Sequence, residues 1–397
     1  SIGRFFDEMY LNTPWEQHYE NLDSRTILDR LAAVKYFVVG KNGNRYLPYG
    51  FTEVKGESKK EKKEYKAYRN NMELPLGYTY DSYIPRSEYE KMSVTEKQQA
   101  LLQWVANKYG DNKNLEAIEF FKHLNTVVLG RNHGTVMIAE ESTAWPMVTG
   151  KAEDGGLGFS LKWNMGWMND FLEYMKLDPY FRKGAHNKMT FSMTYAYSEK
   201  YVLVISHDEV VHLKCSMLNK MPGYPDDKFK NLKAAYAFMF FHPGKKLLFM
   251  GQEFGQLREW SEERELDWYL LGEENHQDLQ DFVKTLLHMY TKYPALYAGD
   301  NTPEGFEWIN ADDADRSIFS FVRKSPTKRN NLLFVVNYTP VERSDYRVGV
   351  PRKKQYKLIM NEHGRLEKPE IYKAEEQECD HREYSIGYSL PPYGVAV

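Results

Sequence analysis

Residues that could do chemistry lie directly after an apolar run at positions 202–205. The run is unbroken and ends in four polar residues, Ser206, His207, Asp208 and Glu209. Such a run is typical of a strand that is buried on both faces. In (β/α) barrels, buried parallel strands present catalytic carboxylates at their C-terminal ends. We therefore expect enzymatic chemistry at this strand end.

Two other stretches have the same form. Residues 135–139 are mostly apolar and precede Glu140 and Glu141, and residues 246–250 precede Glu253. One strand of this kind more often ends in an ordinary polar surface loop. Three of them in chain order, separated by segments long enough for helices, favour a barrel-type active site.

The segments around these strands have the patterns of helices. Asn114 can cap a helix that Gly130 closes, and the chain should form further helices that end near residue 240 and span 281–290. The first helix has apolar residues at helical spacing, at Leu115, Ile118, Phe121, Leu124 and Val128. Alternation of helices and buried strands predicts an α/β fold.

After residue 297 the pattern changes to short strands of alternating polarity, which predicts a small antiparallel β-sandwich. These strands are expected at 306–309, 317–323, 331–338, 356–360 and 383–388.

The first 103 residues differ from the rest of the chain in their sequence pattern. We expect a helix over 25–31, a strand over 34–39, a turn over 40–44 and a helix that ends at residue 102. Lys and Glu alternate over 55–66, which is typical of a solvated segment. This part brings together no nucleophile, base or metal-ligand set.

Composition excludes several classes of protein. A net charge of −3 over 397 residues gives no electrostatic reason to expect a nucleic-acid or anionic-membrane partner. Cys215 and Cys379 have no metal-site spacing and form no disulfide framework. No run approaches the roughly 20 apolar residues of a membrane span, and no signal peptide opens the chain. We expect a soluble polypeptide.

Aromatic residues make up 15% of the chain and are prominent in the segment 161–170. Trp163, Asn164 and Trp167 in this segment could pack a core or line a sugar-binding groove, and composition alone slightly favours the core. Two carboxylates from neighbouring strand ends, with His207 beside one of them, suit retaining glycoside chemistry.

Four motifs in order carry a resemblance to a known family. They span 138–146, 162–170, 206–212 and 247–256. Together they closely resemble the bacterial 1,4-alpha-glucan branching enzymes of the alpha-amylase superfamily, and the resemblance runs from about residue 104 to residue 397. It implies the second half of a (β/α)8 barrel, strands five to eight, over 104–297 and an all-β domain over 298–397.

The resemblance also implies roles for single residues. Glu140, after barrel strand five, matches the general acid/base, and Asp208, after strand seven, matches the carboxylate that stabilises the transition state. His207 matches a substrate-binding residue. Trp163, Asn164, Trp167 and Trp260 are further candidates for sugar contacts, whereas Glu141, Glu209 and His212 are expected to support the site. An α-glucan is the implied partner, the cytoplasm the implied location, and no metal or organic cofactor is implied.

One part of the family pattern is missing. The family's nucleophile is an Asp at the end of strand four, in an Asp-Gly-(Leu/Phe)-Arg-(Val/Leu)-Asp-Ala segment, and no such segment precedes Glu140. Neither Asp81 nor Asp111 follows a buried apolar strand. Residues 104–297 number only 194, against about 250 for a complete barrel. We expect the chain to be nearly inactive.

Residues 1–103 resemble the extracytoplasmic part of another family, the YfhO family of bacterial membrane proteins. The resemblance rests on 22–29, 34–38, 47–51 and 74–83 and stops near Gln103. We interpret the chain as a fusion of a small α+β segment with part of a branching enzyme. Two alternatives remain open, namely a non-catalytic glucan-binding relic and a membrane-associated glycosylation component.

Overall fold

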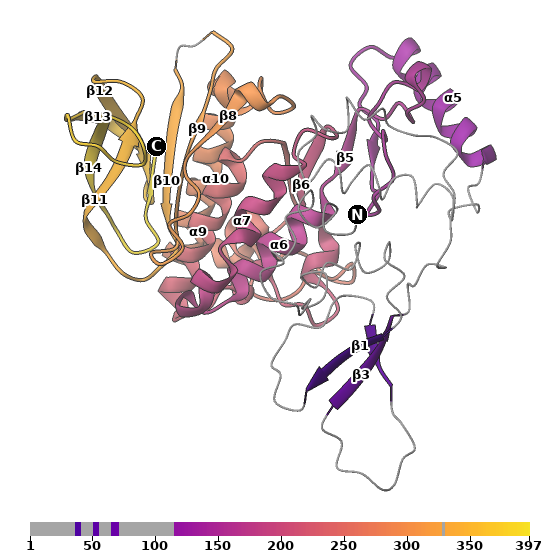
Figure 1. Ribbon diagram of the computed structural model, residues 1–397, viewed down its shortest axis with the longest axis horizontal. Helices are drawn as coiled ribbons and strands as arrows, with labels where there is room; N and C mark the ends of the chain where they lie inside the picture. Colours follow the sequence, from indigo (N-terminus) through magenta and orange to yellow (C-terminus); the bar gives the residue numbers. More distant parts are fainter. Residues whose placement is uncertain (1–35, 41–50, 55–64, 71–114, 328–329) are drawn as a thin grey trace, which may run out of the picture. The chain divides into compact units, whose positions relative to one another are not determined.

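The computed structural model describes residues 36–40, 51–54, 65–70, 115–327 and 330–397 (Figure 1). The chain divides into two compact units, Ser1–Asn114 and Leu115–Val397. Each unit is described by itself.

The first unit contains a three-stranded antiparallel sheet with the order β1-β3-β2. Its strands are β1 (Tyr36–Gly40), β2 (Phe51–Glu53) and β3 (Tyr65–Asn70). β1 overlaps the strand expected over 34–39 and includes Gly40, where a turn was expected to begin. The expected helices over 25–31 and up to residue 102, the rest of the turn and the charged segment 55–64 lie outside the described residues.

The second unit begins with a four-stranded parallel sheet in chain order, β4-β5-β6-β7. The strands are β4 (Ile138–Ala139), β5 (Leu161–Trp163), β6 (Tyr201–Ile205) and β7 (Lys245–Leu248). β6 is buried along almost its whole length, as its unbroken apolar run predicts.

α-Helices lie between β5 and β6 and between β6 and β7, whereas β4 and β5 are joined by loops and a short 3-10 helix, Ala152–Asp154. Two further α-helices precede β4 and follow β7. The longer helices are α5 (Leu115–Arg131), α6 (Met165–Lys176), α9 (Pro225–Phe241) and α10 (Glu274–Lys292), and α7 (Asn187–Thr190) and α8 (Met217–Lys220) are short. The predicted α/β fold with half of a barrel is confirmed: the described part of this unit contains four parallel strands, and α-helices cross over between β5 and β6 and between β6 and β7.

Three local predictions in this sheet differ from the structure. α5 continues through Gly130 to Arg131, because one glycine weakens a helix without ending it. β4 is two residues long, whereas five residues were expected over 135–139. In the described sheet, β4 pairs only with Leu161 and Lys162 of β5, which is itself short. β5 itself was not predicted as a strand, because three residues are too few for a periodicity.

The C-terminal part is a β-sandwich, as predicted. A six-stranded antiparallel sheet, β13-β12-β15-β10-β9-β8, faces the two-stranded sheet β11-β14. Its strands are β8 (Phe306–Asn310), β9 (Ile318–Arg323), β10 (Leu332–Asn337), β11 (Arg343–Val350), β12 (Gln355–Asn361), β13 (Gly364–Lys373), β14 (Tyr384–Leu390) and β15 (Val395–Ala396). The five expected strands match β8, β9, β10, β12 and β14. The charged, largely exposed β13 carried no strand signal.

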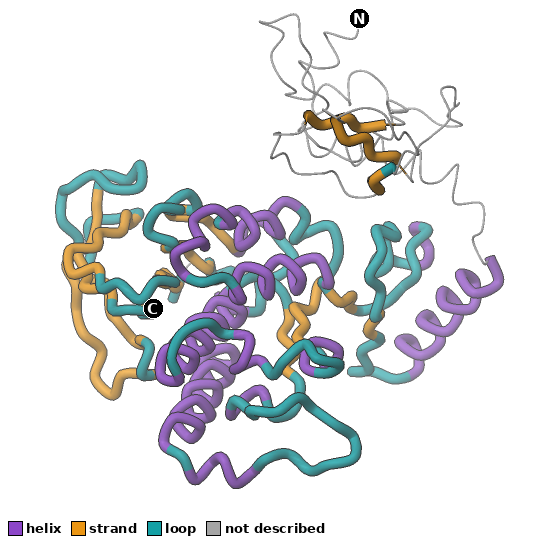
Figure 2. Tube along the Cα trace, turned by 90° about the horizontal axis from the view of Figure 1, so that it is seen from below, coloured by secondary structure: helices purple, strands orange, loops and turns teal. Residues whose placement is uncertain are grey.

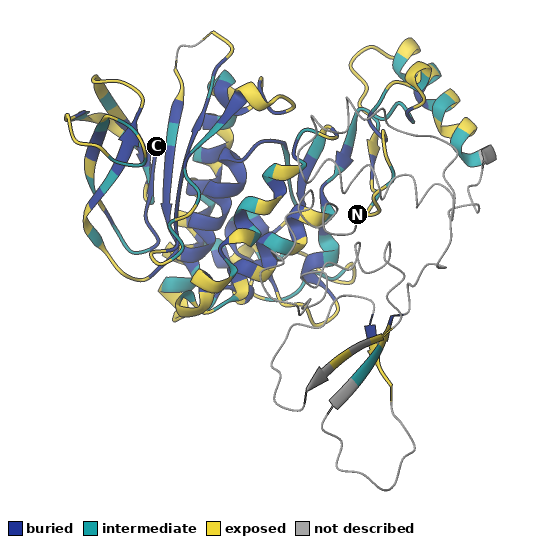
Figure 3. Cartoon of the chain, viewed as in Figure 1, coloured by how far each residue is buried: buried dark blue, intermediate teal, exposed yellow. Residues whose placement is uncertain are grey.

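Helix α9 lies between the parallel sheet and the sandwich (Figure 1), and Figure 2 shows helices, in purple, between strands of the second unit. The Phe238 ring lies 6.4 Å from Phe171 of α6 and 5.9 Å from Phe319 of β9, and Phe241 stacks on Phe334 of β10 at 4.9 Å. α9 is dark along most of its length in Figure 3 because its residues are buried on nearly all sides. The two layers therefore share one hydrophobic core.

A buried ion pair lies at the same junction. Asp300 Oδ1 accepts a 2.7 Å hydrogen bond from Arg323 Nη2 on β9, and both side chains are almost fully buried. Asp300 Oδ2 lies 3.1 Å from Lys245 Nζ at the start of β7 and accepts a 3.2 Å hydrogen bond from Tyr290 of α10. Arg323 also donates to the Phe241 carbonyl at the end of α9. One carboxylate thus connects the sheet, two helices and the sandwich.

We predict that Asp300→Asn lowers the free energy of unfolding by about 3–5 kcal/mol, because the Arg323 guanidinium stays buried without its counter-charge. Urea denaturation followed by tryptophan fluorescence measures the change. Asp315→Asn, at an exposed position, is the control and should stay within about 0.5 kcal/mol of the unaltered chain. Equal stability of the two variants would contradict this role of Asp300.

Candidate active site

The candidate catalytic residues follow neighbouring strands at one edge of the parallel sheet. Glu140 comes directly after β4 and is exposed, and His207 and Asp208 follow β6 after one residue. β5 lies between these strands and ends at Trp163. Because the strands are parallel, all four residues lie at the carboxyl edge, where barrel enzymes hold their substrates.

His207 and Asp208 form a fixed pair at the start of a short 3-10 helix. Ser206 caps this turn, since its Oγ accepts a hydrogen bond from the Asp208 N–H at 3.3 Å. His207 Nε2 lies 3.3 Å from Asp208 Oδ1, and the two side chains are 45% and 44% exposed. The pair is therefore oriented and still open to a ligand.

Two aromatic rings lie beside His207. Its ring lies 5.7 Å from Phe249 and 6.0 Å from Trp260, and these two rings meet edge to face at 5.1 Å. The backbone N–H of Trp260 donates a 2.9 Å hydrogen bond to the Val210 carbonyl, which holds the tryptophan beside the loop that follows β6. A carboxylate, an imidazole and partly open aromatic faces can bind hydroxyl groups and the apolar face of a sugar ring.

Glu141, next to the candidate acid, is an anchor of its loop. Its carboxylate lies 2.6 Å from the buried Lys162 ammonium of β5 and accepts a 2.7 Å hydrogen bond from the Thr143 N–H. Partial burial alone would raise the pKa of Glu141, but hydrogen bonds from Lys162 and Thr143 outweigh it and lower the pKa below 4.5. Glu141 therefore stays ionised and holds the loop that carries Glu140.

The other carboxylates near these strand ends also contact protein groups. Glu209 is buried and lies 3.6 Å from Lys214 Nζ. Glu253 accepts a 2.8 Å hydrogen bond from the Gly251 N–H, and Gly251 has a φ of 88° that suits only glycine well. His212 is exposed in the same loop as Lys214.

Two of the expected sugar contacts need correction. Trp167 is 2% exposed and stacks on Phe171 at 4.6 Å, so neither face of its ring is open to a sugar. Asn164 is 4% exposed and caps α6 by accepting a hydrogen bond from the Trp167 N–H at 2.9 Å. Both residues hold α6 in place. Trp163 and Trp260 are partly exposed and remain candidates.

Lys162 and Phe249 contribute to the site and were missed by sequence reasoning. Lys162 is a charged residue inside a strand, and its burial against Glu141 depends on pairing between β4 and β5. Phe249 is apolar and follows β7, so its sequence pattern indicates only a core residue. Nothing in either local sequence indicates a role beside a strand-end loop.

The described residues contain no group of three or more His, Cys, Asp or Glu side chains that could hold a metal ion. Cys215 and Cys379 are unpaired thiols. In the described part of the chain, no helix has both the length and the apolar character needed to cross a membrane.

Comparison with known proteins gives matches at both ends of the chain. Residues 308–397 match the alpha amylase C-terminal all-beta domain. The 1,4-alpha-glucan branching enzyme GlgB of Butyrivibrio fibrisolvens is 58% identical over 301 residues, which are 74% of this chain and 47% of that protein. The C-terminal part of the chain is similar to branching enzymes. The resemblance inferred from the four motifs is confirmed.

A second branching enzyme, from Halothermothrix orenii, is 49% identical over 298 residues, 73% of this chain and 47% of the relative. The chain spans about half the length of these curated relatives. A crystal structure of an alpha-amylase from H. orenii is 13% identical, with a TM-score of 0.47, and the match covers 87% of this chain and 73% of the amylase.

The N-terminal part is similar to a different family. Residues 1–149 match the family model of the bacterial membrane protein YfhO, as the sequence resemblance predicted. This match extends beyond Gln103, where the resemblance was expected to stop. The chain thus combines sequences that resemble two unrelated families.

We predict that Glu141→Gln lowers the free energy of unfolding by about 1–2 kcal/mol at pH 7, because Lys162 loses a charged hydrogen-bond partner. A carboxylate whose folded-state pKa is lowered adds stability above its unfolded pKa of about 4.5 and loses it as the pH falls further. The difference between Glu141→Gln and the unaltered chain should therefore shrink from pH 6 to pH 3.

Chemical denaturation at each pH tests this prediction. Glu153→Gln is the matched control, since its carboxylate forms an exposed pair with Lys151 and should change stability little at any pH. A Glu141→Gln penalty that is constant over this pH range would show that the ion pair is not its cause.

Proposed function

We propose that residues from about 104 to 397 correspond to the second half of the catalytic barrel and the C-terminal domain of a 1,4-alpha-glucan branching enzyme. The observation that carries this proposal is the position of Glu140 and Asp208 after β4 and β6 of one parallel sheet, with His207 beside Asp208. Its domain boundaries, about residues 104, 297 and 298, belong to the same proposal. The similarity to curated branching enzymes supports it.

In this proposal each residue has a distinct role. Glu140 donates a proton to the oxygen of the α-1,4 bond that breaks, and later takes the proton of the acceptor's 6-hydroxyl group. Asp208 stabilises the positive charge that develops on the sugar ring, and His207 donates a hydrogen bond to the same sugar. Trp260 and Trp163 provide apolar ring surface for an α-glucan.

Retaining transfer also needs a carboxylate that attacks the anomeric carbon. The sequence upstream of Glu140 contains no segment with the family's nucleophile pattern. Without this group no glycosyl-enzyme forms, because Asp208 stabilises charge and does not replace the attacking oxygen. We infer that the chain binds an α-glucan at half of a site and does not branch it.

The proposed partner is glycogen or a linear α-1,4-glucan, and the proposed location is the cytoplasm, where a branching enzyme meets glycogen. A second candidate, a component of a membrane-associated glycosylation system, is supported only by the N-terminal family match.

We predict that the chain forms no measurable α-1,6 branches in linear amylose. Activity should appear when residues 1–114 are replaced by the matching N-terminal part of the Butyrivibrio fibrisolvens enzyme, which supplies the missing strands. In this hybrid, Glu140→Gln and Asp208→Asn should each lower kcat by about 10²–10⁴-fold, as expected for loss of acid/base or charge-stabilising groups.

Chain-length analysis after enzymatic debranching measures the reaction. Glu153→Gln in the hybrid is the control and should stay within about twofold of its parent, because Glu153 is exposed and paired with Lys151. Branching by the unaltered chain that Glu140→Gln abolishes would overturn the inferred inactivity.

We also predict that the unaltered chain is retarded in a native gel that contains glycogen. Trp260→Ala should weaken this binding about tenfold, because a sugar loses an aromatic face worth roughly 1–1.5 kcal/mol. Tyr180→Ala, at a 73% exposed residue in the 3-10 helix Pro179–Ala185, should have no effect. Equal retardation of all three proteins would show that Trp260 does not contribute to glucan binding, and no retardation of any of them would favour an inert fragment.

A further inference from the structure

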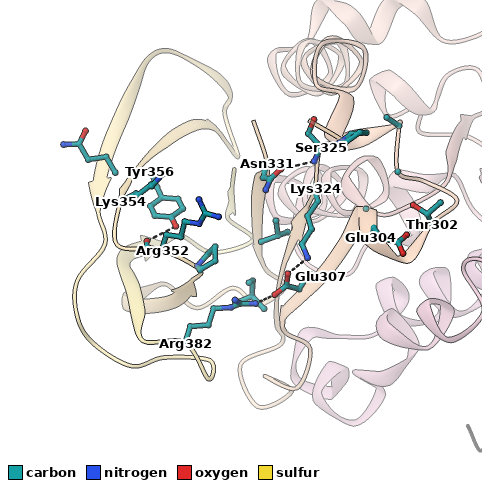
Figure 4. A pocket seen from close by; sticks show the side chains of 18 residues that line it. Thr302, Glu304, Glu307, Lys324, Ser325, Asn331, Arg352, Lys354, Tyr356 and Arg382 are labelled. Atoms are coloured by element: carbon teal, nitrogen blue, oxygen red, sulfur yellow. Dashed lines mark hydrogen bonds and ion pairs between the residues drawn. The ribbon is translucent and has the colours of Figure 1, made fainter. Parts of the chain in front are cut away.

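A pocket of about 580 Å³ lies within the C-terminal part of the second unit (Figure 4). Its walls come from residues within 298–309, 322–326 and 351–356, together with Asn331 and Arg382. It shares no residue with the candidate active site. Its volume is in the range of small-molecule pockets, about 300–1,000 Å³.

The pocket has a positive charge although the chain is negative. Four basic and two acidic residues line it, which gives a net charge of 4 − 2 = +2 against −3 for the whole chain. Glu307 is neutralised within the pocket, since it lies 2.5 Å from Lys324 Nζ and also pairs with Arg382. Burial alone would raise the pKa of Glu307, but hydrogen bonds from these two cations outweigh it and lower the pKa.

The loop at 351–356 provides the remaining cations. Among the described residues, neither Arg352 nor Lys354 forms an ion pair, whereas Lys353 between them pairs with Glu376 at 2.6 Å and does not line the pocket. The loop backbone is held in place, because the Tyr356 hydroxyl donates to the Arg352 carbonyl at 3.0 Å and the Ala374 N–H donates to the Lys354 carbonyl at 3.0 Å. Two uncompensated cations are thus attached to a fixed loop.

The opposite wall is suited to hydroxyl groups. In Figure 4, Thr302 and Glu304 lie across the pocket from Arg352 and Tyr356. The side-chain oxygen Oδ1 of Asn331 accepts a 2.9 Å hydrogen bond from the Ser325 backbone N–H, which leaves the side-chain NH2 group of Asn331 as a donor. Glu304 is exposed and forms no ion pair in the described part of the chain. A ligand that fits both walls has an anionic end and a neutral, hydroxyl-rich end.

We propose that this pocket binds a hexose monophosphate. The phosphate contacts Arg352 and Lys354, because a guanidinium donates two parallel hydrogen bonds to phosphate oxygens and an ammonium adds a point charge. The sugar ring lies against Tyr356, and its hydroxyl groups contact Glu304, Thr302 and Asn331. This site is independent of the proposed glucan site and of branching.

Isothermal titration calorimetry on the full chain tests the site, with glucose 6-phosphate, glucose 1-phosphate, inorganic phosphate and maltose as probes. We expect at least one of the sugar phosphates to bind, with an affinity that falls as NaCl is raised from 20 to 300 mM. The double variant Arg352→Gln/Lys354→Gln should weaken this binding at least tenfold.

Lys353→Gln is the matched control, since it removes a cation from the same loop outside the pocket. The affinity of this variant for the sugar phosphate should stay within twofold of that of the unaltered chain. Trp260→Ala should leave the binding unchanged, so failure of the glucan proposal and failure of this one are distinguishable. The proposal is overturned if neither sugar phosphate binds, if inorganic phosphate or maltose binds as tightly, or if Lys353→Gln weakens binding as much as the double variant.

Discussion

The fold of the second unit depends on a buried carboxylate at the junction of its layers. Asp300 contacts cations and a hydroxyl from β7, α10 and β9, and Arg323 extends the network to the end of α9. A buried charge is stable only when its partners are in place, so the network forms only if the sheet, the helices and the sandwich are assembled together. The aromatic rings of α9 provide the apolar contact area, and the ion pair fixes the register of the layers.

Other buried polar groups lie near this network. His242 is fully buried at the end of α9, and burial lowers its pKa to about 3, so it is neutral and can accept the 3.2 Å contact with Ser192. Lys246 donates to the carbonyls of His242 and Gly244, which end the helix and lead into β7. These contacts hold the start of β7 at the amino edge of the parallel sheet, which is opposite to the carboxyl edge where Glu140 and Asp208 lie.

Much of the candidate site could be predicted because short stretches of the sequence indicate it. An apolar run followed by polar residues located Asp208 and Glu140, and the motifs assigned their roles by resemblance. The features that were predicted wrongly or missed depend on contacts between segments that are distant in the sequence. Trp167 is a core residue because α6 packs on α9, and the Asp300 network joins residues 23 and 55 positions apart. No local pattern encodes such contacts.

The strand that carries Glu140 differs from its neighbours in how well it is held. β4 makes two residue pairs with β5, and Val136 just before it and Ile138 within it are 53% and 45% exposed, whereas β6 is paired on both sides and buried. A general acid acts efficiently only if its oxygen is held where the proton is needed before the substrate arrives. In the proposed roles, Asp208 meets that condition of preorganisation better than Glu140, because it follows the strand that is paired on both sides. In the proposed function, a further strand beside β4 would therefore have a second effect besides carrying the nucleophile, because it would reduce the positional freedom of Glu140.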